Sequence, residues 1–560
     1  MPSYAKKRTR GGRRRRSDYN MNMIPDVTPP RSAFDLSHGR STTHDAGKLI
    51  PIFWADVVPG DTWSVRTGVL SRITTLLFPI MDELITSFHY WFVPYRLVWE
   101  HWQAFCGERK TPDDTTEYLI PQVDMAGNGM LPHSNYDYFD LPLTASTNLR
   151  FNALPFRALC LIWDEWYRDQ NLQDPIDAPT DDGPDPGTLY NALLNRGKRK
   201  DYISGALPWP QKGDAVTMPL GTSAPITGFV DAVANRNVLA GSQAPTYDVG
   251  NQTDISLAHN ATINVTWEQQ PTSGTSLATW NNPALEYNIN NVPISGTADL
   301  SQATSATLAL FRQSVAIQQL YEKDARGGTR YVETLRTHFG VISPDHRLQR
   351  PEWLGGGSAP LSVQPIPNTN SEATAELGTL GAYGTVAGDG IGFQHSFVEH
   401  GIIIGLMSTR APLTYQQNLD RYWSKRDRWE FYWPLLAGIG EQAILNQEVL
   451  WLDQPGTAAD EDQGVWGYSE RFAEYKFMSS KVTGLMRSEV PLATSLDVWH
   501  LALDFESVRP ALNADFIKDE PPVDRVVGVP TQPHFQTNMY HQVRAVRRMP
   551  LYNTPGLSRF

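Results

Sequence analysis

Alternating apolar and polar residues predict strands at places far apart in the chain. In TWSVRTGV, Trp63, Val65 and Val69 alternate with polar or small residues, which is the period of a strand with one buried face. Residues 84–93 (LITSFHYWFV) are largely apolar on both faces and are followed by Pro94, which indicates a strand covered on both sides. Further strand-like patterns occur at 397–409, 471–487 and 496–505.

Helical spacing of apolar residues predicts helices between these strands. The clearest helix spans 155–169, with Pro155 in its first turn. Its apolar stripe consists of Phe156, Leu159, Cys160, Trp163 and Tyr167. Other helices are predicted at 95–106, at 302–324 with a break at Gly327-Gly328, and in TRYVETLRTHF after that break.

The connections between these elements are long. Residues 354–392 are rich in glycine, and we expect an irregular loop there. Pro59 and Gly60 in VVPGDTW predict a turn. Widely spaced strands with helices and long loops between them are typical of a compact β-core whose connections make up most of the mass.

Composition places the chain among folded proteins. It has 560 residues, of which 41% are apolar and 19% charged, which excludes a wholly disordered chain. The two cysteines, Cys106 and Cys160, cannot form a disulfide framework, and we expect both in the core. The N-terminus lacks the apolar stretch of a signal peptide, and runs such as 401–407 are too short to span a bilayer. We expect that the chain is made in a cytoplasm and does not insert into a membrane.

Charge is distributed unevenly. Residues 1–16 carry eight cations and no acid, which leaves 40 basic against 60 acidic residues, or −20, for residues 17–560. Residues 213–300 carry only eight charges in 88 positions and are rich in small polar residues, glycine and proline. We predict four parts: a basic arm (1–33), a first core part with helical insertions (34–212), an outward, charge-poor insertion (213–300), and a second core part with helices, long loops and a C-terminal arm (301–560).

Catalytic and metal-binding signatures are weak. There is no GxSxG motif and no P-loop. His395, Glu399 and His400 resemble HxxEH with one residue too many, in a strand-like stretch, so we interpret them as structural. The acidic loop 174–187 has carboxylates for a cation but no EF-hand spacing. We therefore expect no enzyme, no catalytic residue, no metal and no cofactor.

The basic arm is the strongest chemical signal. Its cations can bind phosphates by counterion release without reading sequence, although such an arm can also serve solubility alone. The predicted nucleic-acid-binding residues are Lys6, Lys7, Arg8, Arg10, Arg13, Arg14, Arg15 and Arg16. A second group, Arg544, Arg547 and Arg548, fits either the same inner surface or surface salt bridges.

Several long stretches carry a family resemblance. Residues 31–63 (RSAFDLSHGRSTTHDAGKLIPIFWADVVPGDTW) closely resemble the major capsid protein of small single-stranded DNA bacteriophages, the Microviridae, in the gokushovirus branch. The resemblance covers most of the chain outside roughly 170–300. It continues at 77–108, 338–358, 468–484, 496–505 and 547–557.

The resemblance implies an eight-stranded viral jelly-roll core with very long insertions, mainly β in class. It implies self-assembly through pentamers into a T=1-like icosahedral shell, or virion, around single-stranded DNA, formed in a bacterial cytoplasm. The implied partners are further copies of the chain, a small basic DNA-packaging protein, a pilot or minor capsid protein, and a host receptor that meets the insertion. No catalytic residue is carried over, and the role of the arm rests on charge alone.

Two other functions remain open at this point. The first is a nucleic-acid-binding module that uses the basic arm as a monomer or small oligomer. The second is a hydrolase whose site the motifs do not reveal. If the chain is a capsid subunit, interface aromatics are needed, and Trp99 and Trp102 are candidates unless they belong to the subunit's own core.

Overall fold

A computed structural model describes residues 30–108, 111, 113, 116–214, 216, 226–231, 294–298, 308–369, 378–454, 456–488 and 495–552. The chain forms two compact units, Met1–Lys212 together with Glu322–Phe560, and Gly213–Tyr321. Most of the predicted arm and of the predicted insertion lies outside the described residues. The four-part division therefore stays a prediction.

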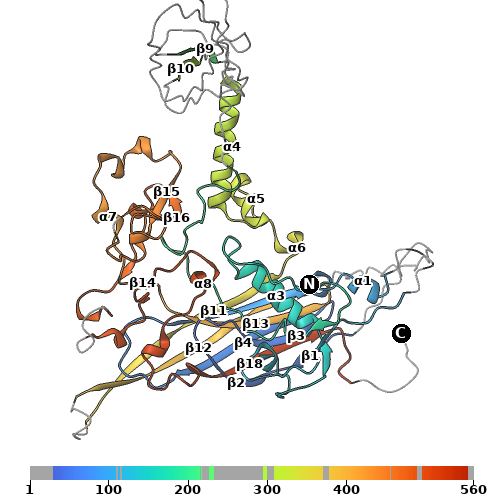
Figure 1. Cartoon of the computed structure of the whole chain (residues 1–560). Coiled ribbons are helices and arrows are strands. Elements are labelled where there is room, and N and C mark those ends of the chain that lie inside the picture. The colour runs from blue at the N-terminus through green and yellow to red at the C-terminus, as the bar shows by residue number, and fades with distance from the viewer. Residues whose placement is uncertain are drawn as a thin grey trace, which may run out of the picture. The chain divides into compact units, whose positions relative to one another are not determined.

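A curled antiparallel sheet dominates the first unit (Figure 1). Its order is β1-β18-β4-β12-β11-β5-β13-β3, and β2 also pairs with β18. The strands are β1 Ser32–Asp35, β2 His38–His44, β3 Ile50–Val57, β4 Thr62–Ile73, β5 Ile85–Pro94, β11 Glu352–Pro367, β12 Leu380–Ser396, β13 Gly401–Arg410 and β18 Phe535–Arg547. The sheet interleaves the first strands of the chain, β1 to β5, with β11, β12, β13 and β18 from its second half. The expected mainly β, jelly-roll-type core is confirmed, with nine described strands in the sheet rather than eight.

Smaller elements fill the connections. The short strands are β6 Gln122–Asp124, β7 Arg150–Asn152, β8 Asp185–Pro186, β9 Ile226–Asp231, β10 Ile294–Ala298, β14 Thr414–Tyr415, β15 Glu441–Leu445, β16 Val465–Glu470 and β17 Ser480–Lys481. The α-helices are α1 Trp102–Phe105, α2 Asn135–Tyr138, α3 Leu154–Trp166, α4 Leu308–Gly327, α5 Tyr331–Phe339, α6 Asp345–Leu348, α7 Arg421–Ser424 and α8 Ala514–Ile517. The 3₁₀ turns are η1 Tyr95–Leu97, η4 Arg428–Glu430, η5 Pro434–Leu436, η6 Asn446–Glu448, η7 Ala473–Tyr475, η8 Gly484–Met486, η9 Asp497–Trp499 and η10 Val523–Arg525.

The curl of the sheet encloses one core and α3 closes a second. Trp63 and Val65 of β4 pack with Tyr90 of β5 inside the curl. Thr67 of β4 links β5 and β18 across this core, because its hydroxyl lies 2.5 Å from the Tyr90 hydroxyl and 2.9 Å from Nδ1 of His541. On the other face of β5, Trp91 and Val93 pack against α3. β5 is therefore covered on both sides, as its sequence predicts.

The predicted helices are confirmed at α3, α4 and α5. All five residues of the α3 stripe are buried, from Phe156 to Tyr167. α4 runs on to Gly327, where the predicted break occurs. The predicted helix at 95–106 is wrong in part, because it is divided into the short η1 and α1.

The glycine-rich loop predicted at 354–392 is wrong, since it contains most of β11 and β12. The glycines allow neighbouring strands to approach closely. A Cβ at Gly356 would lie 2.1 Å from the Phe88 carbonyl oxygen, and one at Gly392 would lie 1.9 Å from that of Val65. These positions therefore need glycine because the strands pack closely, and the glycines do not indicate a loop.

Two of the three other strand predictions are also wrong. The third, at 397–409, is confirmed by β13. Residues 471–487 hold only the two-residue β17 beside two 3₁₀ turns, and 496–505 hold η9 and no strand. In the latter segment, the Leu503 amide donates to the Thr414 carbonyl of β14 at 2.9 Å, and side chains supply two further hydrogen-bond partners. The amide of Leu501 donates to Asp82 at 2.5 Å, and that of Phe505 donates to Gln417 at 2.8 Å. Periodicity does not reveal such partners.

Candidate assembly and nucleic-acid surfaces

The eight cations predicted to bind nucleic acid, Lys6 to Arg16, lie outside the described residues, so their role stays a prediction. The second basic group is described, and its members differ. Arg547 is structural, because its Nε lies 3.1 Å from the buried Asp61 carboxylate and its guanidinium covers the Trp63 ring. Arg544 is instead exposed on β18.

The solvent face of β18 and β4 is mostly polar and carries arginines, although Leu70 on β4 is also 48% exposed there. Along β18 the exposed side chains alternate with buried ones, and they are Gln536, Asn538, Tyr540, Gln542 and Arg544. On neighbouring β4, the exposed Arg66 and Arg72 lie opposite Gln542 and Gln536. A hollow of about 650 Å³ next to Arg72 is lined mainly by hydroxyl and amide side chains of β2 and β18. Amides, hydroxyls and arginines can contact phosphates and bases without a preference for sequence.

The acids near this face are few. Asp35 pairs with Arg544 in the β1–β18 register, and Asp389 lies beside Gly68. Asp137 lines the same hollow as Arg72. Three arginines therefore face three carboxylates, so this face is close to neutral, in contrast to the −20 of residues 17–560. We refer to Arg66, Arg72, Arg544 and their amide neighbours as the arginine face.

A second surface is apolar and exposed. We refer to it as the aromatic surface, and it consists of Tyr422, Trp423, Trp429, Phe431, Tyr432, Trp433, Leu435 and Ile439, which are 44% to 90% exposed. These residues belong to α7, η4, η5 and their links. A gathering of large apolar side chains on the surface marks an interaction site.

Local contacts hold the aromatic surface in place. Nε1 of Trp433 donates to the Arg428 carbonyl at 3.0 Å, and the Arg428 guanidinium lies 4.6 Å from the Trp429 ring centroid. Glu430 accepts a hydrogen bond from the Asp427 amide at 3.1 Å. Because this surface is ordered before any partner binds, association costs less conformational entropy.

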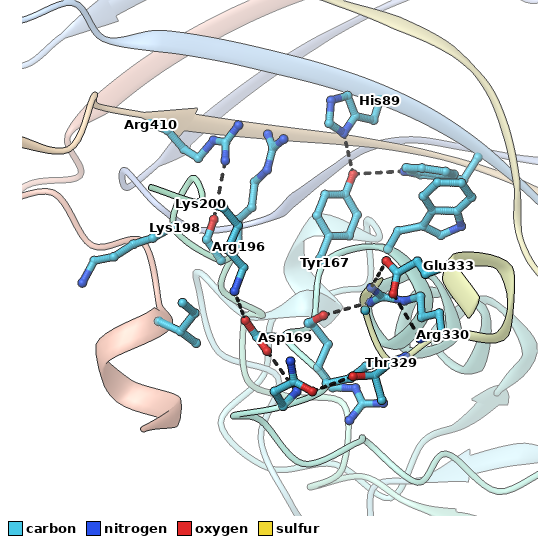
Figure 2. A pocket seen from close by; sticks show the side chains of 18 residues that line it. His89, Tyr167, Asp169, Arg196, Lys198, Lys200, Thr329, Arg330, Glu333 and Arg410 are labelled. Carbon is cyan, nitrogen blue, oxygen red and sulfur yellow. Dashed lines mark hydrogen bonds and ion pairs between the residues drawn. The ribbon is translucent and has the colours of Figure 1, made fainter. Parts of the chain in front are cut away.

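A polar cavity of about 400 Å³ lies between the end of α3, residues 196–200 and the turn 328–333 (Figure 2). Six cations and two acids line it. The cations are Arg168, Arg196, Lys198, Lys200, Arg330 and Arg410, and the acids are Asp169 and Glu333.

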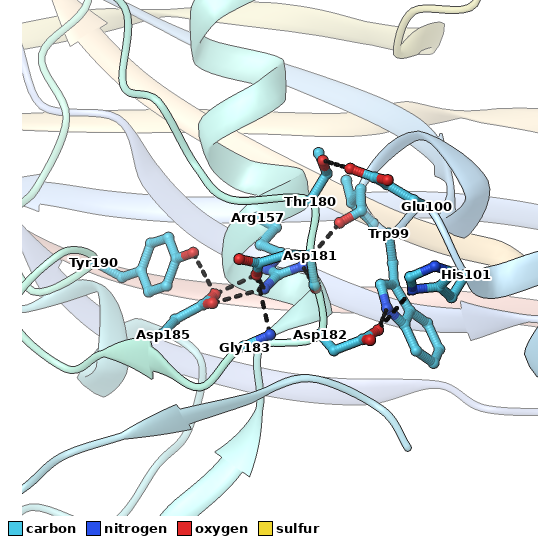
Figure 3. Close-up of polar contacts among 11 residues, drawn as sticks. Trp99, Glu100, His101, Arg157, Thr180, Asp181, Asp182, Gly183, Asp185 and Tyr190 are labelled. Carbon is cyan, nitrogen blue, oxygen red and sulfur yellow. Dashed lines mark hydrogen bonds and ion pairs between the residues drawn. The ribbon is translucent and has the colours of Figure 1, made fainter. Parts of the chain in front are cut away.

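Three carboxylates of the acidic loop 174–187, those of Asp181, Asp182 and Asp185, contact neighbouring side chains (Figure 3). Asp185 binds the buried Arg157, with Nη2 to Oδ1 at 2.6 Å, and it also accepts from the Tyr190 hydroxyl at 2.7 Å. Asp182 accepts from Nε1 of Trp99 at 2.8 Å and lies 2.9 Å from Nδ1 of His101. The loop therefore joins α3 to the chain after β5.

Trp99 is 0% exposed in this arrangement, so of the two alternatives left open by the sequence, a subunit contact or the subunit's own core, the burial favours the core. Burial and the bond to Asp182 make it part of the subunit's own core. Trp102 is partly buried against Tyr95, with ring centroids 4.7 Å apart. The core prediction for the cysteines is confirmed for Cys160 and wrong for Cys106, which is exposed because α1 ends before a full apolar face forms.

The HxxEH-like residues do not converge. His395 lies 3.8 Å from Glu352, whereas Glu399 pairs with Arg96 at 2.7 Å and the His400 ring packs on Trp102. Among the described residues, no group of three or more His, Cys, Asp or Glu side chains can hold a metal ion. In the same part of the chain, no helix is long and apolar enough to cross a membrane.

Comparison with known proteins yields matches over nearly the whole chain. Residues 22–557 match the family described as capsid protein (F protein). Capsid protein VP1 of Bdellovibrio phage phiMH2K is 42% identical over 548 residues, covering 97% of this chain and 98% of the relative. Capsid protein VP1 of Chlamydia phage 1 is 37% identical over 593 residues, covering 96% and 97%, and that of Spiroplasma virus 4 is 32% identical over 564 residues, covering 97% and 98%. These matches confirm the resemblance found in the sequence.

Proposed function

The chain belongs to the phage capsid protein (F protein) family, and from that premise we propose that about 60 copies assemble, through pentamers, into a T=1-like icosahedral shell around single-stranded DNA. The protein is a major capsid protein and a component of the virion. We propose that its role is structural and involves no catalysis.

The aromatic surface carries the assembly proposal. If each of its eight side chains buries about 100 Å², the sum is about 800 Å², which is what one partner contributes to a standard-size interface. At about 25 cal/mol per Å² of apolar area, such burial is the main source of binding free energy, before the entropy of association is subtracted. A second copy of the chain is the partner that a shell subunit meets first.

The arginine face and the basic arm support the DNA proposal. Eight arm cations in about 60 copies give roughly 480 positive charges, each able to neutralise one phosphate. A genome of several thousand nucleotides is then neutralised only in part, so a small basic packaging protein or other cations supply the remainder. Because residues 17–560 carry −20, we propose that the arm projects inward and bridges the acidic body and the DNA.

The insertion at 213–300 is proposed to meet the host cell surface. It is low in charge and rich in small polar residues, which suits an exposed segment rather than a core. A host receptor and a pilot or minor capsid protein complete the proposed partners.

Electron microscopy of the purified full-length protein tests the function. A shell of about 60 copies of a 62.8 kDa subunit has a mass of about 3.8 MDa. Closed, uniform particles support the proposal. A protein that stays monomeric at high concentration and binds DNA would instead favour the simpler nucleic-acid-binding module.

A further inference from the structure

The polar cavity of Figure 2 holds more positive charge than its acids balance. Most of its cations have partners. Arg168 pairs with Asp164 at 3.3 Å, Lys200 pairs with Asp169, and Arg330 pairs with Glu333 at 3.6 Å. Lys198 donates to the Phe516 carbonyl at 2.5 Å and lies over the Phe516 ring.

Arg196 and Arg410 have weaker partners: Arg410 has a long contact with one acid and donates from Nη1 to the Gly197 carbonyl at 3.5 Å. Arg196 forms no ion pair with any described residue, and its guanidinium lies 5.6 Å from the Tyr167 ring centroid. Nε of Arg410 is buried, has no hydrogen-bond partner in the described part of the chain, and lies 3.9 Å from the Asp519 carboxylate. Asp519 is 3% exposed and is the acid that both arginines share.

The electrostatics of this pair are unfavourable without an anion. Burial lowers the pKa of both arginines, and the charge of Arg196 further lowers that of Arg410, to about 10. Burial likewise raises the pKa of Asp519 to about 6, which leaves it mostly ionised at pH 7.5 as the one counter-charge of the pair. Two partly buried cations that share a single carboxylate leave one positive charge that a bound anion would balance.

The remaining wall of the cavity is aromatic and neutral. The Tyr167 hydroxyl lies 2.7 Å from Nδ1 of His89 and accepts a hydrogen bond from Nε1 of Trp91 at 3.1 Å. Burial lowers the pKa of His89 to about 4, so it is uncharged at neutral pH. This wall adds no acid that could neutralise the two arginines.

We propose that this cavity binds a phosphate group, free or carried by a nucleotide, between Arg196 and Arg410. Guanidinium groups present paired N–H donors that match the oxygens of phosphate, and their charge is retained on burial. At about 400 Å³ the cavity is larger than an inorganic phosphate requires and lies in the range of small-molecule sites. The cavity uses none of the residues of the aromatic surface or the arginine face.

Calorimetric titration of the purified full-length protein in chloride buffer at pH 7.5 tests this site. The probes are inorganic phosphate, thymidine monophosphate and a short oligothymidine. The variants are Arg196→Gln and Arg410→Gln, with Arg347→Gln as the matched control, because Arg347 is exposed and does not line the cavity. Melting temperature is measured with and without inorganic phosphate.

We expect inorganic phosphate to bind the wild type and raise its melting temperature. Arg196→Gln and Arg410→Gln should each weaken binding at least tenfold and remove the phosphate-dependent rise, while Arg347→Gln changes affinity less than twofold. Tighter binding of thymidine monophosphate than of phosphate would show that the cavity also contacts the nucleoside, and equal binding would assign the site to the oxyanion alone. A wild type that binds none of the three probes, or an equal loss in Arg347→Gln, would overturn the proposal. Particle formation is scored separately, so this failure is distinct from a failure to assemble.

Discussion

Arg157 and Asp185 form an ion pair that is almost wholly removed from water. Nη2 lies 2.6 Å from Oδ1 and Nε lies 2.8 Å from Oδ2, and the two side chains are 1% and 0% exposed. Nη1 of Arg157 also donates to the carbonyl oxygens of Val98 and Asp181. One residue of α3 thereby fixes both the acidic loop and the chain that follows β5.

Removing the cation of this pair should destabilise the subunit strongly. Arg157→Met leaves Asp185 buried without its partner, which costs about 3–5 kcal/mol. Urea unfolding of the dissociated subunit measures the loss. Asp174→Asn, an exposed acid of the same loop, is the control and should change stability by less than about 0.5 kcal/mol. Equal effects of the two substitutions would show that the pair has no special role.

Subunit stability should fall as the pH drops below about 6.5. Burial lowers the pKa of His44 to about 3, with His534 adding to the shift, and that of His541 to about 4. Both stay neutral in the fold, while the unfolded chain binds protons near pH 6.5, so the stability they contribute is complete above 6.5 and is lost as the pH falls toward 4. Each contributes a slope of about 1.4 kcal/mol per pH unit in that window.

Comparison with His541→Asn isolates this effect from other titrating groups. The variant should show a shallower dependence of unfolding free energy on pH between 6.5 and 4, by about 1.4 kcal/mol per unit. Urea unfolding at pH 7, 6 and 5 is the measurement. Parallel curves for variant and wild type would contradict the assignment.

Binding to single-stranded DNA should depend steeply on salt and little on sequence. Up to eight arm contacts give a slope of log affinity against log salt of roughly −6, as an upper bound. Deleting residues 1–16 should flatten the slope and leave pentamers intact. Substituting glutamine at Arg66, Arg72 and Arg544 together should flatten it by about 2, with Arg347→Gln as a single-charge control outside the arginine face.

Fluorescence titration with oligothymidine at several salt concentrations measures these slopes. An arm deletion that keeps the full affinity and slope would show that the arm is not the DNA contact. A deletion that abolishes pentamers would show that the arm is structural. No change in the triple arginine variant would remove the arginine face from the DNA proposal.

The insertion should be dispensable for assembly. We expect particles from a variant in which a short Gly/Ser linker replaces residues 213–300, with impaired adsorption to host cells. A second variant replaces only 232–293, because β9 and β10 pair and bring the ends of that segment together. Insoluble protein from both variants would place the insertion in the fold, and normal adsorption would exclude it as the attachment site.

Part of this architecture is readable from the sequence because its physical causes are local. The stripe of α3 and the doubly apolar β5 follow from periodicity alone. β11 and β12 cannot be predicted from periodicity, because their glycines are needed for the close approach of β5 and β4, which are distant in sequence. The alternation at 496–505 misleads for the same reason, since its hydrogen-bond partners come from other segments.

The functional surfaces show a similar division. The basic arm can be predicted from composition. The arginine face cannot, because it depends on the strand register that places Arg66 opposite Gln542. The aromatic surface lies in RYWSKRDRWEFYWPLLAGIG, and its density of aromatics is a signal that could have been noticed. The three-dimensional structure is needed to show that these rings are exposed, whereas Trp99 is buried.

The central claim, that the subunit assembles through the aromatic surface, is tested most directly by sedimentation velocity. The variant carries Trp423→Ser, Leu435→Ser and Ile439→Ser, three of the four most exposed members at 72%, 90% and 63%. Val398→Ser, at a residue 87% exposed elsewhere, is the control. We predict shells of about 3.8 MDa for the wild type and the control, and single subunits of unchanged unfolding free energy for the triple variant. Shells of normal size from the triple variant would contradict the account.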